Sequence, residues 1–210
     1  MAWLETSGTR NWLGCGLALL FSFASLGGER LDALFPTGAT VVLLAGLPGD
    51  VESENSYAEQ VQAWLEIAQG SGNVQDLIVL SDNSEGAGLG AAGKLILRAD
   101  RTNFMSLGAT LAGGTNPLVV IAWGHGGKQG NLPVFHVRGP RLAPSDFKGL
   151  ASQADGRESR WILMFRGSGA FARQLAGEQR QILSSESDTM FASDPIGMAV
   201  LLKLARMTTC

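Results

Sequence analysis

Five short apolar runs separated by longer amphipathic segments constrain the fold of this chain more than any other feature of its sequence. The runs lie at 39–49, 76–83, 117–124, 160–165 and 180–185. Each has the length and composition of a buried strand. Helical patterns alternate with them at 56–69, 100–114, 139–153, 167–177 and 194–206. This alternation predicts a three-layer α/β/α fold, with helices on both faces of a mainly parallel sheet.

Local signals set the expected boundaries of the helices. Ser56 and Glu59 have the spacing of a capping box, which predicts that the first helix begins at Ser56. Its expected buried face consists of Tyr57, Val61, Trp64, Leu65 and Ala68. Thr102 is the expected cap of the second helix. The Gly/Ala-rich stretch at 84–94 is expected to be a loop.

The composition is that of one globular domain. The chain has 210 residues, of which 45 % are hydrophobic and 17 % are charged. No internal repeat and no second hydrophobic core is visible in the sequence. The net charge is −3 without a basic run, so no nucleic acid is expected as a partner.

The N-terminal segment predicts a cellular location. Arg10 precedes an apolar stretch at 11–27, which is short for a membrane span and typical of a signal peptide. We therefore expect 1–27 to be a signal peptide or an uncleaved anchor, 28–38 a linker, and 39–207 the folded domain. The protein is expected to be exported, to be periplasmic, extracellular or membrane-anchored, and to contact the membrane only through the N-terminal segment. A buried N-terminal helix is the alternative, but the stretch has no polar face.

The two cysteines, Cys15 and Cys210, lie at the two ends of the chain. No disulfide within the domain and no cluster of Cys and His ligands for a metal is therefore expected. No cofactor is expected either. The folded middle of the chain also lacks any cysteine that could serve as a nucleophile.

His125 directly follows the third apolar run and is flanked by Gly124 and Gly126. A histidine can act as a base near neutral pH, and the carboxyl ends of parallel strands are where ligands bind in such sheets. Flanking glycines would let a substrate approach the backbone. The alternative interpretation is a histidine on a surface loop without a chemical role.

Ser168 follows the fourth run, on a strand-to-helix turn that contains Gly167. It could be a nucleophile for His125 or the cap of the following helix. The G-x-S-x-G motif of α/β-hydrolases is absent, because Arg166 and Ala170 occupy its two glycine positions. The lysine of "GHGGK" is followed by Gln129, which excludes a phosphate-binding P-loop.

The remaining charged residues give weaker indications. Asp50, Glu52, Glu54 and Asp82 follow the first two runs and are interpreted as solvated loop charges. Arg138 and Arg141 flank a Gly-Pro pair and could bind an anion or be surface charges.

Four segments occur in an order that resembles a known family: "AWGHGG", "FHVRGPRLAPSDFKGL", "RWILMFRGSGAF" and "RQILSSES". Together with "AGLPG" near residue 45, they resemble the caspase-like fold of caspases and legumains. The chain looks closest to bacterial, exported caspase-like proteins over about residues 39–205. The Gly-His-Gly and Arg-Gly-Pro segments are the most specific parts of the resemblance.

The resemblance implies that His125 is the catalytic histidine of a cysteine peptidase relative and that position 166 is that of the nucleophilic cysteine. Arg166 stands there instead, and an arginine cannot attack a carbonyl. Gly127, Lys128 and Arg141 also depart from the family pattern, as does "SSESDTM" after the last run. Gly124, Gly126, Gly167 and Arg138 are the expected binding residues around this site.

Three hypotheses about function follow. The first is an inactive, caspase-like binding or scaffold module with a peptide or protein ligand in a groove at the strand ends. The second is an active hydrolase that uses His125 and Ser168. The third is an assembly in which a partner chain, joined through a sheet edge, supplies missing parts.

Overall fold

The structure, a computed structural model, describes residues 34–48, 51–82, 88–90 and 94–185. The expected signal or anchor at 1–27, most of the linker, and the helix at 194–206 lie outside these residues. No helix within the described ranges has both the length and the apolar character needed to span a membrane.

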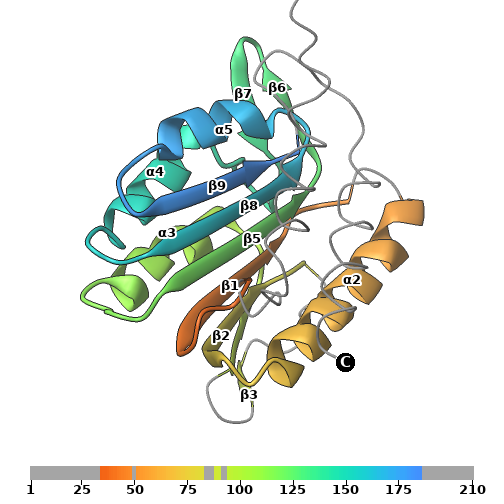
Figure 1. Cartoon of the computed structure of the whole chain (residues 1–210). Coiled ribbons are helices and arrows are strands. Elements are labelled where there is room, and N and C mark those ends of the chain that lie inside the picture. Colours follow the sequence, from red (N-terminus) through yellow and green to blue (C-terminus); the bar gives the residue numbers. More distant parts are fainter. Residues whose placement is uncertain (1–33, 49–50, 83–87, 91–93, 186–210) are drawn as a thin grey trace, which may run out of the picture. The chain divides into compact units, whose positions relative to one another are not determined.

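The centre of the fold is a sheet with the strand order β3-β4-β2-β1-β5-β8-β9 (Figure 1). Its six parallel strands are β1 (Ala39–Ala45), β2 (Val74–Leu80), β4 (Lys94–Leu97), β5 (Leu118–Gly124), β8 (Ser159–Phe165) and β9 (Arg180–Ser184). β3 (Gly88–Gly90) pairs with β4 in the antiparallel direction. The prediction of a mainly parallel sheet is confirmed, as are the five predicted strands.

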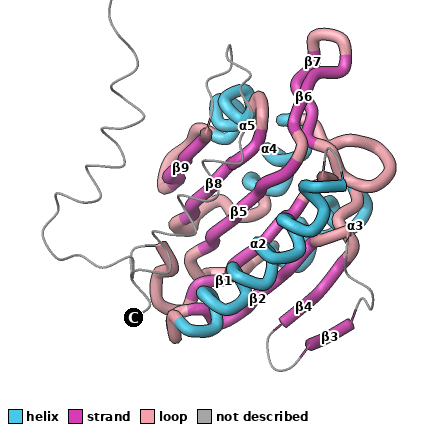
Figure 2. The backbone as a smooth tube through the Cα atoms, turned by 90° about the vertical axis from the view of Figure 1, so that its right-hand side faces the viewer, coloured by secondary structure: helices cyan, strands magenta, loops and turns pink. Residues whose placement is uncertain are grey.

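Helices cover both faces of the sheet and complete the three layers. α2 (Val51–Gly70) lies on one face, whereas α3 (Arg101–Leu111), α4 (Pro144–Ser152) and α5 (Ser168–Leu175) lie on the other (Figures 1 and 2). Their buried side chains form two separate hydrophobic clusters. Trp64 and Ala68 of α2 belong to one cluster, while Phe104, Phe147 and Phe171 belong to the other.

Alternation along the strands divides the apolar side chains between these clusters. Val119 and Ile121 of β5 face the α2 side, and Val120 and Ala122 face the side of α3, α4 and α5. All seven residues of β5 are buried. Each fully buried Val, Leu or Ile side chain stabilises the fold by about 1.5–3 kcal/mol. The sequence of a strand that is buried on both faces is therefore a continuous run of apolar residues.

Two predicted helix starts are wrong. α2 begins at Val51, so Ser56 lies inside the helix, where its hydroxyl accepts a hydrogen bond from Gln60 Nε2 at 3.1 Å. The cap of α3 is Asp100 and not Thr102: Asp100 is extended, and its carboxylate accepts the Asn103 N–H at 2.8 Å.

Two short hairpins were also not predicted from the sequence. The stretch expected to be a loop at 84–94 contains β3 and the first residue of β4. After β5, β6 (Gly126–Gln129) and β7 (Leu132–Phe135) form a second, two-stranded sheet. Its turn holds Gly130 at φ +60°, a conformation that suits glycine.

Asp146 joins α3 to α4 and is expected to be a strong contributor to stability. Its buried carboxylate accepts the Ala143 N–H at 2.8 Å, at the start of α4, and Arg101 Nη2 at 2.7 Å. Asp146→Ala should lower the free energy of unfolding by about 2–3 kcal/mol in urea titrations, because both charge-assisted hydrogen bonds are lost.

Glu158→Ala is the matched control, since Glu158 is an exposed residue that pairs with Arg160 at 2.7 Å. Removing this exposed carboxylate should cost less than about 1 kcal/mol. Equal losses for the two variants would contradict the assignment of Asp146 as the link between the helices.

Candidate functional site

The carboxyl ends of β5 and β8 bring His125 and Arg166 side by side. The register pairs Gly124 with Phe165, and His125 and Arg166 are the next residue on each strand. Both residues are exposed. The pair that the family resemblance assigns to base and nucleophile thus leaves the sheet at neighbouring positions.

The glycines around His125 have a packing explanation. A Cβ atom at Gly126 would lie 2.0 Å from the Arg166 carbonyl oxygen, which no side chain can accommodate. A Cβ at Gly124 would lie 2.8 Å from the Gly46 Cα, and Gly124 has a φ of +150°. Both glycines are buried. Their role in this structure is close packing of backbone on backbone, where the sequence had indicated access for a ligand.

His125 lies against a second histidine that sequence reasoning did not select as a site residue. The two imidazole rings meet edge to face, with centroids 4.8 Å apart. The His125 N–H donates to the Leu47 carbonyl at 3.1 Å, and the His125 carbonyl accepts the His136 N–H at 2.9 Å. The β6–β7 hairpin returns the chain so that His136 comes opposite His125. The short turn around Gly130 is the sequence signal that could have indicated this pairing.

The electrostatic surroundings disfavour a charge on His136. Burial lowers the pKa of His136, and the neighbouring His125 and Arg141 lower it further. Each of these causes favours the neutral imidazole. A neutral His136 can accept a hydrogen bond through one ring nitrogen and donate through the other.

Ser168 is the first residue of α5 and is fully buried. Its Oγ lies 3.4 Å from Ser185 Oγ, just after β9. The interpretation of Ser168 as the helix cap is wrong, because the N-cap is Gly167, with a φ of +81° and no side-chain cap hydrogen bond. The left-handed backbone of this turn requires glycine, which explains Gly167 without a ligand.

Arg138 lies away from this pair, beside the ends of β2 and β4. Its Nε and Nη2 donate to the two carboxylate oxygens of Asp82, at 2.6 and 2.8 Å. Its backbone N–H donates to the Ala99 carbonyl at 2.9 Å. The hydrogen bond and the charge of Asp82 raise the pKa of Arg138. Asp82 is therefore an ion-pair partner, and its interpretation as a solvated loop charge is wrong.

Other predicted site residues have these positions. Arg141 is exposed, and its carbonyl accepts a hydrogen bond from Arg101 Nη1 at 3.2 Å. The side chains at 50, 52 and 54 lie outside the described part of the structure. Within the described ranges, no group of three or more His, Cys, Asp or Glu side chains is arranged to hold a metal ion.

The comparisons with known proteins leave the family open. No protein-family model matches the chain, and no curated protein matches it significantly. The resemblance to caspase-like proteins therefore stays a prediction from the sequence segments named above.

Gly126 and Gly127 offer a test of the packing at this site. Gly126→Ala should lower the free energy of unfolding by about 1–3 kcal/mol or more, because the new methyl group overlaps the Arg166 carbonyl. Gly127→Ala is the control, since its Cβ would make an ordinary contact of 3.5 Å with His136 Nε2. Chemical unfolding of both variants measures the difference. Similar stabilities would contradict the close approach of the two turns.

The lowered pKa of His136 makes the folding stability of the protein depend on pH. The unfolded chain binds a proton near pH 6.5, whereas folded His136 binds it only at a lower pH. The stability that the fold gains from keeping His136 neutral is therefore fully present above pH 6.5, and it is lost as the pH falls through the pKa of folded His136. The other groups that act on His136 are His125 and Arg141. Arg141→Gln should raise the His136 pKa in an NMR titration. An unchanged value would show that Arg141 does not act on the ring.

Proposed function

We propose that this chain is a caspase- and legumain-like, peptidase-related domain that does not hydrolyse peptides and instead binds a peptide or protein ligand. The proposed ligand surface lies at the carboxyl ends of the parallel strands, around His125 and Arg166, and is called the carboxyl edge below. An exported location, periplasmic, extracellular or membrane-anchored, belongs to the same proposal. The order of the resembling segments and the parallel sheet between helices support it.

The observation that carries the proposal is the identity of the residue that follows the neighbouring strand β8, which is Arg166. His125 directly follows β5 and Arg166 directly follows β8, at adjacent positions of the register, so the residue beside the histidine is an arginine. A guanidinium is always protonated and has no lone pair to attack a carbonyl carbon. It can donate several hydrogen bonds, so this pair of residues is suited to binding.

The groups at this edge favour a ligand rich in hydrogen-bond acceptors. Arg141 and Arg166 are exposed, and His125 is exposed beside the half-buried His136. An extended peptide presents backbone carbonyls, which such donors can bind. The glycine backbones beneath them are held by close packing, so the edge is preorganised.

The alternative, an active serine hydrolase, requires Ser168 to reach a substrate. Its side chain is fully buried, and its hydroxyl lies near that of Ser185. A nucleophile in this position would need the β8–α5 turn to rearrange before it could meet a substrate. The arrangement of the turn therefore supports binding over hydrolysis.

Turnover measurements separate the two functions. Purified protein should show no hydrolysis of a panel of Arg-, Lys-, Asn- and Asp-ending peptides and esters above the level of His125→Ala and Ser168→Ala. Binding of the same peptides, followed by fluorescence anisotropy, should weaken in Arg166→Ala by about tenfold, the loss expected for one charged donor. Turnover that disappears in both His125→Ala and Ser168→Ala would overturn the proposal.

Lys148→Ala is the control for the binding measurement, because Lys148 is an exposed cation on α4. Its removal changes the net charge by the same amount as Arg166→Ala. Equal weakening by the two variants would indicate a nonspecific charge effect.

A further inference from the structure

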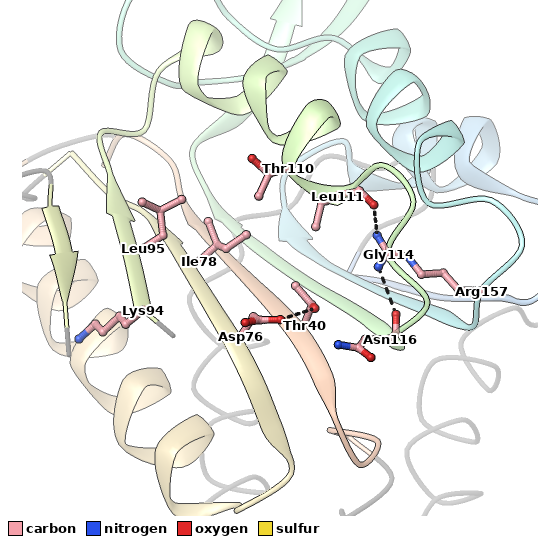
Figure 3. Close-up of a pocket in the computed structure, with 10 residues that line it drawn as sticks. All are labelled: Thr40, Asp76, Ile78, Lys94, Leu95, Thr110, Leu111, Gly114, Asn116 and Arg157. Atoms are coloured by element: carbon pink, nitrogen blue, oxygen red, sulfur yellow. Dashed lines mark hydrogen bonds between the residues drawn. The ribbon is translucent and has the colours of Figure 1, made fainter. Parts of the chain in front are cut away.

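A cavity of about 280 Å³ lies at the amino-terminal ends of the parallel strands, opposite to the end that holds His125. Figure 3 shows the residues that line it. Its walls come from the amino-terminal parts of β1, β2 and β4 and from the end of α3. This volume is slightly below the range of pockets for drug-sized ligands, so the cavity suits a metabolite of a few heavy atoms.

Strand register explains why polar side chains face this cavity. β1 pairs Thr40 with Asp76, and side chains of paired residues lie on the same face of a sheet. That face is the one covered by α3, since Ile78, two residues further along β2, packs in the cluster that contains Leu111. Lys94 also lines the cavity, but it pairs with Leu77, so its side chain belongs to the other face of the sheet. In Figure 3 the amino group of Lys94 is directed away from Asp76.

Asp76 has unused capacity to accept hydrogen bonds. Its described hydrogen bond comes from the Thr40 hydroxyl at 3.3 Å, which is long for a bond to a carboxylate. Among the described residues, Asp76 takes part in no ion pair. A carboxylate can accept about four hydrogen bonds, so most of its acceptor positions are available in the cavity.

Arg157 brings the opposite charge to the same cavity. It is 7 % exposed, and its Nη1 and Nη2 donate to the carbonyls of Asn116 and Leu111 at 3.2 and 3.0 Å. Its Nε is buried without a hydrogen-bond partner within the described structure, and no described carboxylate pairs with its charge. Burial lowers the pKa of Arg157, which reflects the cost of this charge. An anionic group beside it would offset that cost.

The apolar part of the lining is aliphatic. Ile78, Leu95 and Leu111 come from three different elements and line the cavity with the polar groups. A ligand with an aliphatic group would bury it against them at about 25 cal/mol per Å² of apolar surface.

We propose that this cavity binds a small zwitterion with an aliphatic side group, of the class of free aliphatic α-amino acids. Asp76 and Thr40 receive the ammonium group, the guanidinium of Arg157 attracts the carboxylate, and the aliphatic wall takes the side chain. Asp76 and Arg157 line the same cavity, and they form no ion pair with each other. A ligand that carries one positive and one negative charge complements this arrangement. The site is separate from the carboxyl edge and does not depend on the function proposed for it.

Calorimetric titration of the full chain with L-leucine tests the proposal. Binding is expected at sub-millimolar concentration. N-acetyl-leucine, which lacks the ammonium, and leucinamide, which lacks the carboxylate, should each bind at least about tenfold more weakly. Glycine should also bind more weakly, because it has no side chain to place against the aliphatic wall.

Asp76→Asn keeps the shape of the side chain and should weaken leucine binding by about tenfold or more. Asp155→Asn, at an exposed carboxylate in the segment before β8, is the control and should leave binding unchanged. Because Arg157→Gln removes both hydrogen bonds to carbonyls and can unfold the chain, the comparison with leucinamide tests the role of Arg157.

Three outcomes would overturn the proposal. The first is no binding of any of the aliphatic amino acids at about 10 mM, the weak end of measurable affinities. The second is equal binding of leucine, N-acetyl-leucine and leucinamide. The third is unchanged leucine binding in Asp76→Asn.

Discussion

Burial of the parallel sheet on both faces is the constraint on which the rest of this structure depends. β5 has no exposed residue, and its side chains alternate between the two hydrophobic clusters. Within such strands, polar side chains would cost several kcal/mol unless they were paired. Chemistry is therefore confined to the two ends of the sheet. His125 lies at the carboxyl end, and Asp76 and Arg157 lie at the amino end.

The sequence was sufficient to predict elements whose stability is local or whose burial is complete. Runs such as 117–124 predict strands because two-sided burial demands apolar residues without interruption. The short strands β3, β6 and β7 could not be predicted in this way. β3 and β6 contain glycines, β7 contains Pro133, and each has only three or four residues, so pairing with another segment holds them in place. The same limit applies to the cap of α3: Asp100 and Thr102 are both acceptable caps by residue type, and backbone geometry decides for Asp100.

The candidate site was predictable to the extent that it follows strand order. His125 and Arg166 come after neighbouring parallel strands, so their proximity follows from the topology. His136 reaches His125 only through the β6–β7 hairpin, and Arg138 reaches Asp82 across 56 positions of the sequence. Such contacts join residues that are distant in the sequence, so they cannot be predicted from a local sequence pattern. The sequence predicts that the glycines beside His125 give a ligand access, whereas in the structure the backbone of neighbouring turns packs against them.

In the function we propose, the exposure of Arg166 explains how a caspase-like domain could exchange its nucleophile and keep its fold. Phe165 and Gly167, on either side, are buried, and Gly126 packs against the Arg166 backbone. The side chain at position 166 is itself exposed and belongs to neither hydrophobic cluster. Exchange of a cysteine for an arginine there would remove the means of attack on a carbonyl while leaving the hydrophobic clusters intact. Exchange of either flanking residue would instead disturb the core or the left-handed turn. In the function we propose, a reactive cysteine at position 166 can therefore be replaced by an arginine that binds a ligand, with little change in the free energy of unfolding.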